Sequence, residues 1–185
     1  IKVCKKCTYT NQKPNSTIEF RYKLDDKKTG LVFDDDVCIA CMYSEIQKNN
    51  QIDWDQRRKE LMSVCDKFRS NSNKYDCIVP GSGGKDSFYA ALILKEDFGM
   101  NPLTVTWAPH LYTDWGWHNF KMWIDSGLPN FLYHPNGAVH RFLSRLCLEN
   151  LLHPFQPFIL GQYGFPLHCS QKFGIKLVFY GENSA

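Results

Sequence analysis

Residues 75–87 of the chain read YDCIVPGSGGKDS. The apolar residues Cys77–Val79 predict a buried parallel strand, and the sequence FYAALILK at 88–95 predicts a helix. The glycine-rich turn between them would direct several free backbone N–H groups at the start of the helix toward one point. The sequence therefore predicts a cradle for an anion such as a phosphate group.

The side chains of this turn suit an anion. The glycines at positions 81, 83 and 84 allow positive φ angles and a close approach of the ligand to the backbone. Ser82 and Ser87 offer hydroxyl donors, and Lys85 offers a positive charge.

The motif differs from two common phosphate-binding loops. A Walker A loop has Ser or Thr directly after its lysine, whereas Asp86 follows Lys85 here. A Rossmann turn has its third glycine where Asp86 stands. The remaining structural alternative is a glycine-rich strand-to-helix turn with no ligand.

Composition indicates a globular protein with one ordinary domain and a small module. The 185 residues are 43% hydrophobic, and their formal net charge is only +3. Because the basic residues are spread along the chain, no stripe of charge predicts a nucleic-acid partner. No run has the length of a membrane span, and the N-terminus lacks the apolar core of a signal peptide. We therefore expect a cytoplasmic protein without a membrane partner.

Four of the eight cysteines form two Cys-x-x-Cys pairs. Cys4 with Cys7 and Cys38 with Cys41 have the spacing of a structural zinc site, because two intervening residues let both sulfurs of a pair reach one tetrahedral ion. A hairpin of residues 18–22 and 31–33 around a turn at 25–30 would complete a zinc ribbon. Redox or disulfide chemistry is the alternative. Lys5 and Lys6 are expected to offset part of the thiolate charge.

The rest of the chain alternates strands and helices. An amphipathic helix is expected at 52–68 and a polar linker at 69–74, so we divide the chain into a zinc-ribbon module (1–48), a helix and linker (49–73) and a nucleotide domain (74–185). Alternation predicts an α/β domain with a parallel sheet and helices on both faces. The further strands are expected at 102–107, 130–134 and 175–180, and the further helices at 119–125, 139–152 and 155–173.

Ligands of such sheets bind beyond the carboxyl ends of the strands. Trp107 ends the second expected strand, and core packing is the favoured role for this residue taken alone, because an aromatic residue at a strand end usually fills the sheet surface. Gly181 and Glu182 follow the last expected strand, and the Glu182 carboxylate suits Mg²⁺. The predicted nucleotide-binding residues are Ser82, Gly83, Gly84, Lys85, Asp86, Ser87, Trp107, Gly181 and Glu182.

The hexapeptide SGGKDS at 82–87 resembles the PP-loop of the ATP pyrophosphatases, which cut ATP between its α and β phosphates. Nearly the whole chain is similar to the N-acetyl sugar amidotransferase family within that group. The resemblance implies an adenine nucleotide alpha hydrolase-like (HUP) domain, truncated at Ala185, since family members continue further. The matching segments are CxxC at 4–7 and 38–41, IDWDQR at 52–57, YDCIVP at 75–80, NPLTVT at 101–106, TDWGWHN at 113–119, HPNG at 134–137, PFQPF at 154–158 and YGEN at 180–183.

The resemblance implies conversion of a sugar acetamido group to an acetamidino group for surface polysaccharide, lipopolysaccharide or pseudaminic acid biosynthesis. ATP with Mg²⁺ activates the carbonyl oxygen, and ammonia comes from a glutaminase subunit, with a cyclase-like subunit beside it. Lys85, Asp86 and Ser87 would be the catalytic residues. The residues expected to recognise an N-acetylated sugar or nucleotide sugar are Thr113, Asp114, Asn119, Asn136 and Arg141.

Two other functions fit parts of the pattern. A PP-loop enzyme that modifies tRNA also adenylates a carbonyl, but such enzymes usually carry a further cysteine pair and a basic face, whereas Cys147 and Cys169 are isolated. A non-catalytic nucleotide-binding assembly module is the second alternative, and Lys85, Asp86 and Ser87 argue against it. We interpret Cys169 as a packing residue.

Overall fold

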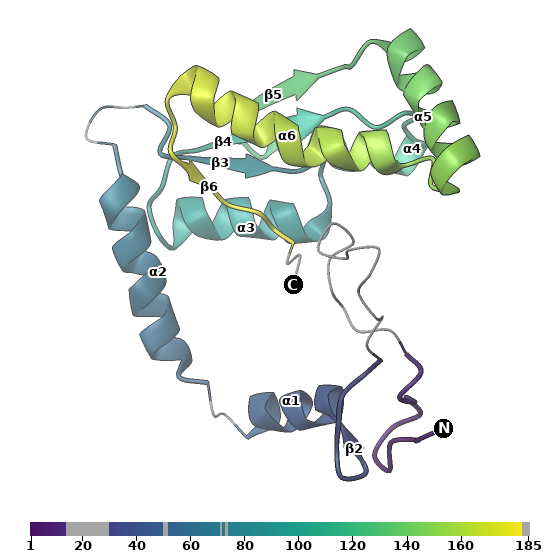
Figure 1. Cartoon of the computed structure of the whole chain (residues 1–185). Helices are drawn as coiled ribbons and strands as arrows, with labels where there is room; N and C mark the ends of the chain where they lie inside the picture. Colours follow the sequence, from purple (N-terminus) through teal and green to yellow (C-terminus); the bar gives the residue numbers. More distant parts are fainter. Residues whose placement is uncertain (14–29, 50–51, 71, 73, 183–185) are drawn as a thin grey trace. The chain divides into compact units, whose positions relative to one another are not determined.

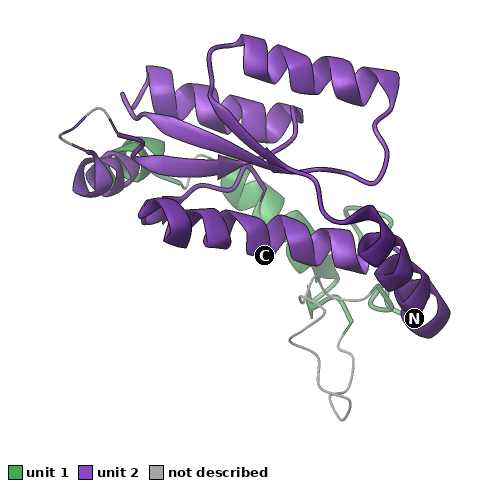
Figure 2. Cartoon of the chain, turned by 90° about the horizontal axis from the view of Figure 1, so that it is seen from above, with its two compact units in different colours: residues 1–60, 184–185 green, residues 61–183 purple. Residues whose placement is uncertain are grey.

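The computed structural model describes residues 1–13, 30–49, 52–70, 72 and 74–182. The chain forms two compact units, residues 1–60 and residues 61–183 (Figure 2). Within the described ranges, no helix combines the length and the apolar character needed to cross a membrane.

The first unit contains a short hairpin and a helix. Strands β1 (Phe33–Asp34) and β2 (Val37–Cys38) pair in antiparallel fashion, and helix α1 (Ile39–Lys48) follows directly. The sequence analysis did not predict α1, although its residues IACMYSEIQK contain neither glycine nor proline. The predicted hairpin arm at 18–22 and the turn at 25–29 lie outside the described residues.

The second unit is built on a sheet of four parallel strands, which confirms the predicted α/β fold class. The strands are β3 (Cys77–Pro80), β4 (Pro102–Trp107), β5 (Asn130–Tyr133) and β6 (Leu177–Val178). Their order is β5-β4-β3-β6, so the chain winds outward from β3 to β5 and then returns to the other side of β3. The carboxyl ends of β3 and β6 therefore form the topological switch point, where such sheets bind ligands.

Helices cover both faces of this sheet (Figure 1). On one face, β3 packs with α3 (Lys85–Glu96) and α4 (Asp114–Asp125) through a core that contains Val79, Leu94 and Trp123. On the other face, Ile78 and Val105 pack against Phe165 of α6 (Gln156–Phe173). Helix α5 (Gly137–Leu151) packs against α6. Because β3 is buried on both faces, its residues are apolar without alternation.

Two elements differ in extent from the prediction. Helix α4 begins at Asp114 rather than near residue 119, because the hydroxyl of Thr113 accepts a hydrogen bond from the Gly116 N–H and caps the helix. Strand β6 pairs with β3 over only two residues, so most of the apolar run at 175–180 flanks the sheet instead of extending it.

Helix α2 (Trp54–Phe68) crosses the division between the units, and its last turns belong to the sheet domain. Cys65 is fully buried in the core beneath α3. The predicted apolar face is only partly correct, since Trp54 and Val64 are exposed. Asp53 begins the helix by accepting a hydrogen bond from the Gln56 N–H.

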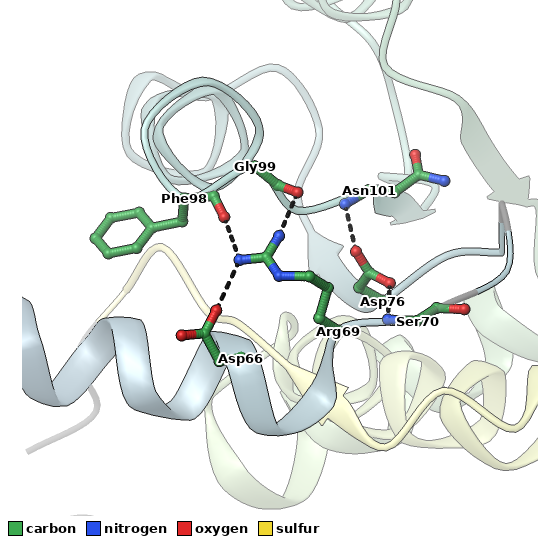
Figure 3. A network of polar contacts seen from close by, with 7 residues as sticks. All are labelled: Asp66, Arg69, Ser70, Asp76, Phe98, Gly99 and Asn101. Atoms are coloured by element: carbon green, nitrogen blue, oxygen red, sulfur yellow. Dashed lines mark hydrogen bonds and ion pairs between the residues drawn. The ribbon is translucent and has the colours of Figure 1, made fainter.

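A polar network holds the end of α2 against the sheet domain (Figure 3). The Arg69 guanidinium donates to the carbonyls of Phe98 and Gly99, at 2.7 Å and 2.5 Å. The buried carboxylate of Asp76 accepts from the Ser70 N–H at 2.6 Å and from the Asn101 N–H at 2.8 Å. The segment after α2 is therefore anchored at Arg69 and Ser70, although its composition alone suggests a free linker.

Replacing Asp76→Ala should lower the free energy of unfolding of the sheet domain by about 2–4 kcal/mol, because two partly buried N–H groups lose a charged acceptor. Asp125→Ala is the matched control, since its carboxylate forms an exposed pair with Lys121 and should change stability by less than about 1 kcal/mol. Urea denaturation measures both. Equal losses in the two variants would contradict the anchoring role.

Candidate functional site

A cavity of about 290 Å³ opens at the switch point of the sheet. The loop after β3 supplies one wall, α6 supplies another, and the segment after β6 closes the third side. Its volume is at the lower end of the range for ligand pockets. Predicted nucleotide-binding residues that line it are Ser82, Gly84, Ser87, Trp107, Gly181 and Glu182.

Two glycines allow the segments around the cavity to approach closely. Gly83 has a φ of +91°, and a Cβ atom there would lie 2.6 Å from the backbone carbonyl carbon of Asn119. A Cβ atom on Gly181 would lie 2.6 Å from the backbone of Ser87. The chain after β6 therefore rests directly on the first turn of α3, which is possible only without a side chain at position 181.

The N-terminus of α3 is the polar end of the cavity. Gly84 occupies the N-cap position, where no side chain satisfies the free N–H groups of the first turn. The Ser87 hydroxyl donates to the Gly84 carbonyl at 3.1 Å and also lines the cavity. This end of the helix dipole is positive and accepts an anion.

Lys85 and Asp86 do not line this cavity. They lie in a neighbouring depression with Gly83 and Asn119, and the Lys85 Nζ is 2.8 Å from the nearer Asp86 carboxylate oxygen. The Lys85 side chain is 88% exposed, so the pair is held weakly and can rearrange when an anion binds. The predicted catalytic role of these two residues stays a prediction.

The Trp107 side chain belongs both to the apolar core and to the wall of the cavity. The indole packs against Phe165 and Tyr133 in the core and also lines the cavity. A Cβ atom on Gly161 would lie 2.2 Å from the indole, so the glycine makes room for the ring beside α6. The indole Nε1 is buried and has no hydrogen-bond partner among the described residues.

The sequence analysis missed the contribution of α6. Ile159, Gln162 and Tyr163 line the cavity, together with Tyr180 from the segment after β6. Burial raises the pKa of the Tyr180 phenol, so it is a neutral hydroxyl at physiological pH. Nothing in the helical pattern of residues 156–173 indicates which side chains face the switch point, because that depends on how α6 crosses the sheet.

The predicted sugar-binding residues are spread over several places. Thr113 and Asn136 cap α4 and α5, where the Asn136 carboxamide oxygen accepts from the N–H groups of Ala138 and Val139. Asp114 begins α4 and is exposed. Asn119 lies in the depression beside Lys85, and Arg141 lies in a separate hollow near the start of α6. The structure therefore does not gather the five residues into one site.

The four predicted metal ligands come together in the first unit. The Sγ atoms of Cys4, Cys7, Cys38 and Cys41 all lie within 4.8 Å of one another. The Cys4–Cys41 sulfurs are 3.9 Å apart and the Cys7–Cys38 sulfurs 3.7 Å apart. A tetrahedral zinc ion with Zn–S bonds of about 2.3 Å needs sulfur separations of about 3.8 Å. The cluster is thus compatible with a closed structural zinc site and a zinc ribbon.

Backbone N–H groups support the sulfurs. Cys38 N–H donates to the Cys4 Sγ at 3.3 Å, and Lys6 N–H donates to the same atom at 3.4 Å. These bonds, with that from Cys38 the strongest, lower the pKa of Cys4 to about 6, whereas hydrogen bonding to Cys7 and burial raise the pKa of Cys41 to about 12. Without a cation, the four thiols therefore do not ionise together.

Lys5 and Lys6 do more than offset thiolate charge. Lys5 forms an ion pair with Asp36, and Lys6 forms one with Glu45. Both pairs join the first cysteine pair to the segment that carries the second. The carboxylates of Asp36 and Glu45 and the thiolates attract the same two ammonium groups. Lys5 and Lys6 therefore balance only part of the negative charge of the cysteine cluster.

Comparison with known proteins adds a single partial likeness. No family model matches the chain. The uncharacterized protein MJ1599 of Methanocaldococcus jannaschii is 35% identical over 69 residues, which are 37% of this chain and 24% of the archaeal protein. The match thus covers about a quarter of that relative's length, and its name assigns no activity.

Proposed function

We propose that the cavity at the switch point binds ATP, with the phosphates at the N-terminus of α3. The observation that carries this proposal is the uncapped first turn of α3, which opens into a cavity lined by Ser82 and Ser87 and bordered by the close contact of Gly181 with Ser87. An isolated glycine turn does not need the close approach of Gly181 to Ser87. A phosphate group would accept hydrogen bonds from the free N–H groups of this turn and from the two serine hydroxyls.

The reaction we propose is that of an N-acetyl sugar amidotransferase, for which the resemblance of the sequence is the support. The acetamido oxygen of the sugar attacks the α-phosphorus of ATP, and pyrophosphate leaves with the electrons of the α–β bridge. Ammonia from a glutaminase partner then adds to the activated carbon, AMP departs with the former carbonyl oxygen, and an acetamidino group remains. The product belongs to surface-polysaccharide or nonulosonic acid biosynthesis.

The residues of the chain divide the work by position. Backbone N–H groups of the first turn of α3 and the hydroxyls of Ser82 and Ser87 bind the phosphate end. Lys85 offsets the charge that develops on the leaving pyrophosphate after it releases Asp86. Asp86 or Glu182 is the carboxylate that would hold Mg²⁺, and of the two Glu182 lines the cavity. The zinc site remains structural, since four thiolates leave no open coordination position.

A binding and turnover experiment tests this function. We expect calorimetry to detect ATP binding to the wild type, weakened about tenfold or more in Lys85→Met, because a charged phosphate contact is lost. Lys121→Met is the control, since Lys121 pairs with Asp125 on α4 and lies outside the cavity. Absence of ATP binding to the wild type would overturn the proposal.

Pyrophosphate release identifies the acceptor. The assay combines ATP, Mg²⁺ and ammonium with N-acetylated sugars and nucleotide sugars, and mass spectrometry follows the replacement of oxygen by NH. Release that requires tRNA instead would favour the tRNA-modifying alternative. Binding of ATP without release with any acceptor would favour the assembly module.

A further inference from the structure

A second hollow, of about 190 Å³, lies near the turn between α5 and α6. It is separate from the cavity at the switch point, and no lining residue is common to the two. Its volume equals that of about six liquid water molecules, which is ample for a carboxylate or phosphate group. The lining residues are His110, Arg141, Ser144, Pro154 and Phe155.

One buried polar atom without a partner, the Ser144 hydroxyl oxygen, belongs to a residue that lines this hollow. Seven such side-chain atoms occur among the described residues, and four of them belong to Trp107, His140, Ser144 and His153. Ser144 lines the hollow and lies one helical turn beyond His140, while His153 directly precedes Pro154. Native structures leave few buried polar groups unsatisfied, so the unpartnered Ser144 hydroxyl in the lining of this hollow points to a ligand.

His110, which lines this hollow, stacks on His140. The rings of His110 and His140 are 4.1 Å apart and nearly parallel, and His140 is only 6% exposed. Burial, together with the charge of His110, lowers the pKa of His140, so its ring is neutral at physiological pH. Phe155 and Phe158 contact the ring of His110 as well, which holds the exposed imidazole in place.

Arg141 supplies a cation that the fold does not use. Within the described part of the chain, no ion pair involves Arg141, whereas Arg145 one turn later pairs with Glu149 at 2.7 Å. A guanidinium presents paired N–H donors that match a carboxylate or phosphate. An anion in the hollow would therefore pair with Arg141 without breaking an existing contact.

We propose that this hollow is an oxyanion-binding site, in which Arg141 pairs with a carboxylate or phosphate group and His110 and Ser144 donate further hydrogen bonds to it. Binding turns the Ser144 hydroxyl, which has no partner in the fold, toward the anion. Pro154 and the 59% exposed Phe155 face the carbon skeleton that carries the anion. The chemical classes that fit the hollow share one feature, an oxyanion attached to an apolar carbon skeleton.

The site adjoins the ATP cavity through one side chain. Trp107 lines that cavity, and its ring lies edge-on to His140 with centroids 6.1 Å apart. The lining of the hollow is thus linked to that of the cavity through the contacts of His110 with His140 and of His140 with Trp107. This placement suits the anionic part of an acceptor molecule, although the oxyanion site itself does not rest on the proposed reaction.

Titration with simple anions tests the site without nucleotide. The zinc-loaded 185-residue chain is titrated with inorganic phosphate and, separately, with acetate, while NMR follows the histidine ring nitrogens. We expect saturable shifts at His110 and His140. The tighter of the two ions identifies whether the natural ligand carries a phosphate or a carboxylate.

Three variants complete the test. Arg141→Gln should weaken binding about tenfold or more, because a charge-assisted contact is lost. His110→Gln should weaken it severalfold and also assigns the ring signals. Arg145→Gln should bind within about twofold of the wild type, since Arg145 pairs with Glu149 outside the hollow. The side chains of these arginines are exposed, so melting temperatures should stay close to that of the wild type.

Either of two results overturns the proposal. One is that neither ion shifts the ring signals of His110 and His140, and the other is that Arg141→Gln and Arg145→Gln bind equally well. Failure of ATP to bind would contradict only the proposed function, because the anion titration contains no nucleotide.

Discussion

Removal of zinc with a chelator is expected to unfold residues 1–48 while the sheet domain stays folded. The described part of residues 1–48 contains a small hairpin and helix α1, and α1 buries none of its residues, so burial contributes little. A structural zinc site contributes about 10–16 kcal/mol of binding free energy in comparable small modules. The sheet domain keeps its two apolar cores, which contain no cluster cysteine.

Zinc content by elemental analysis and ¹H–¹⁵N spectra before and after chelation measure this effect. Cys38→Ser should lose zinc and give the same spectrum as the chelated protein, because Cys38 is fully buried in the cluster. Cys147→Ser on α5 is the control and should retain one zinc per chain. A folded first unit in the zinc-free protein would contradict the structural role.

The same cluster should release its metal on acidification. Zinc binds thiolates, so protons compete with it, and the pKa of Cys41 is raised to about 12 in the free cluster. Zinc binding is therefore coupled to proton release, and the apparent affinity should fall steadily as the pH decreases. An affinity independent of pH would indicate that other ligands replace the thiols.

Gly83→Ala is expected to abolish ATP binding, with a loss of about 100-fold or more. The substituted residue would keep a φ of +91° only under strain, and its Cβ atom would lie 2.6 Å from the backbone of Asn119. The backbone of Asn119 on α4 cannot move aside as a flexible side chain does, so the loop must move away from α4. Calorimetric titration with ATP measures the loss.

Gly164→Ala is the matched control for this substitution. Gly164 lies within α6, and a Cβ atom there has no neighbour within 4 Å, so the change should leave ATP binding unaltered and slightly stabilise the helix. Thermal melting of Gly83→Ala shows whether the domain remains folded. Full ATP affinity in a folded Gly83→Ala protein would exclude the loop from the nucleotide site.

The strands of the sheet domain were predicted well, because each is marked by a short apolar run in the sequence. Strand β4 has the predicted bounds, and β3 and β5 match within a residue, since short apolar runs between glycine and proline residues are typical of parallel strands. Helix α1 was not predicted, because the Cys-x-x-Cys spacing is typical of a zinc ribbon made of strands. The start of α4 was misplaced because the cap at Thr113 was not recognised.

The candidate sites divide in a similar way. The cysteine cluster and the loop at 82–87 could be predicted because each is made of residues close in sequence, or of pairs with a spacing set by chemistry. The contribution of Gln162 and Tyr163 could not, since it depends on the crossing of α6 over β3 and β4. The orientation of Lys85 and Asp86 away from the cavity also depends on the start of α3.

Sequence alone therefore determined the α/β class, the grouping of the four cysteines and the glycine turn, because periodicity, cysteine spacing and backbone freedom are properties of short segments. The packed structure decided that Gly181 rests on Ser87, that Thr113 and Asn136 cap helices, and that Arg141 lies beside stacked histidines. The contacts of Gly181 with Ser87 and of His110 with His140 join residues far apart in the chain, and only the burial of two cores around one sheet brings them together.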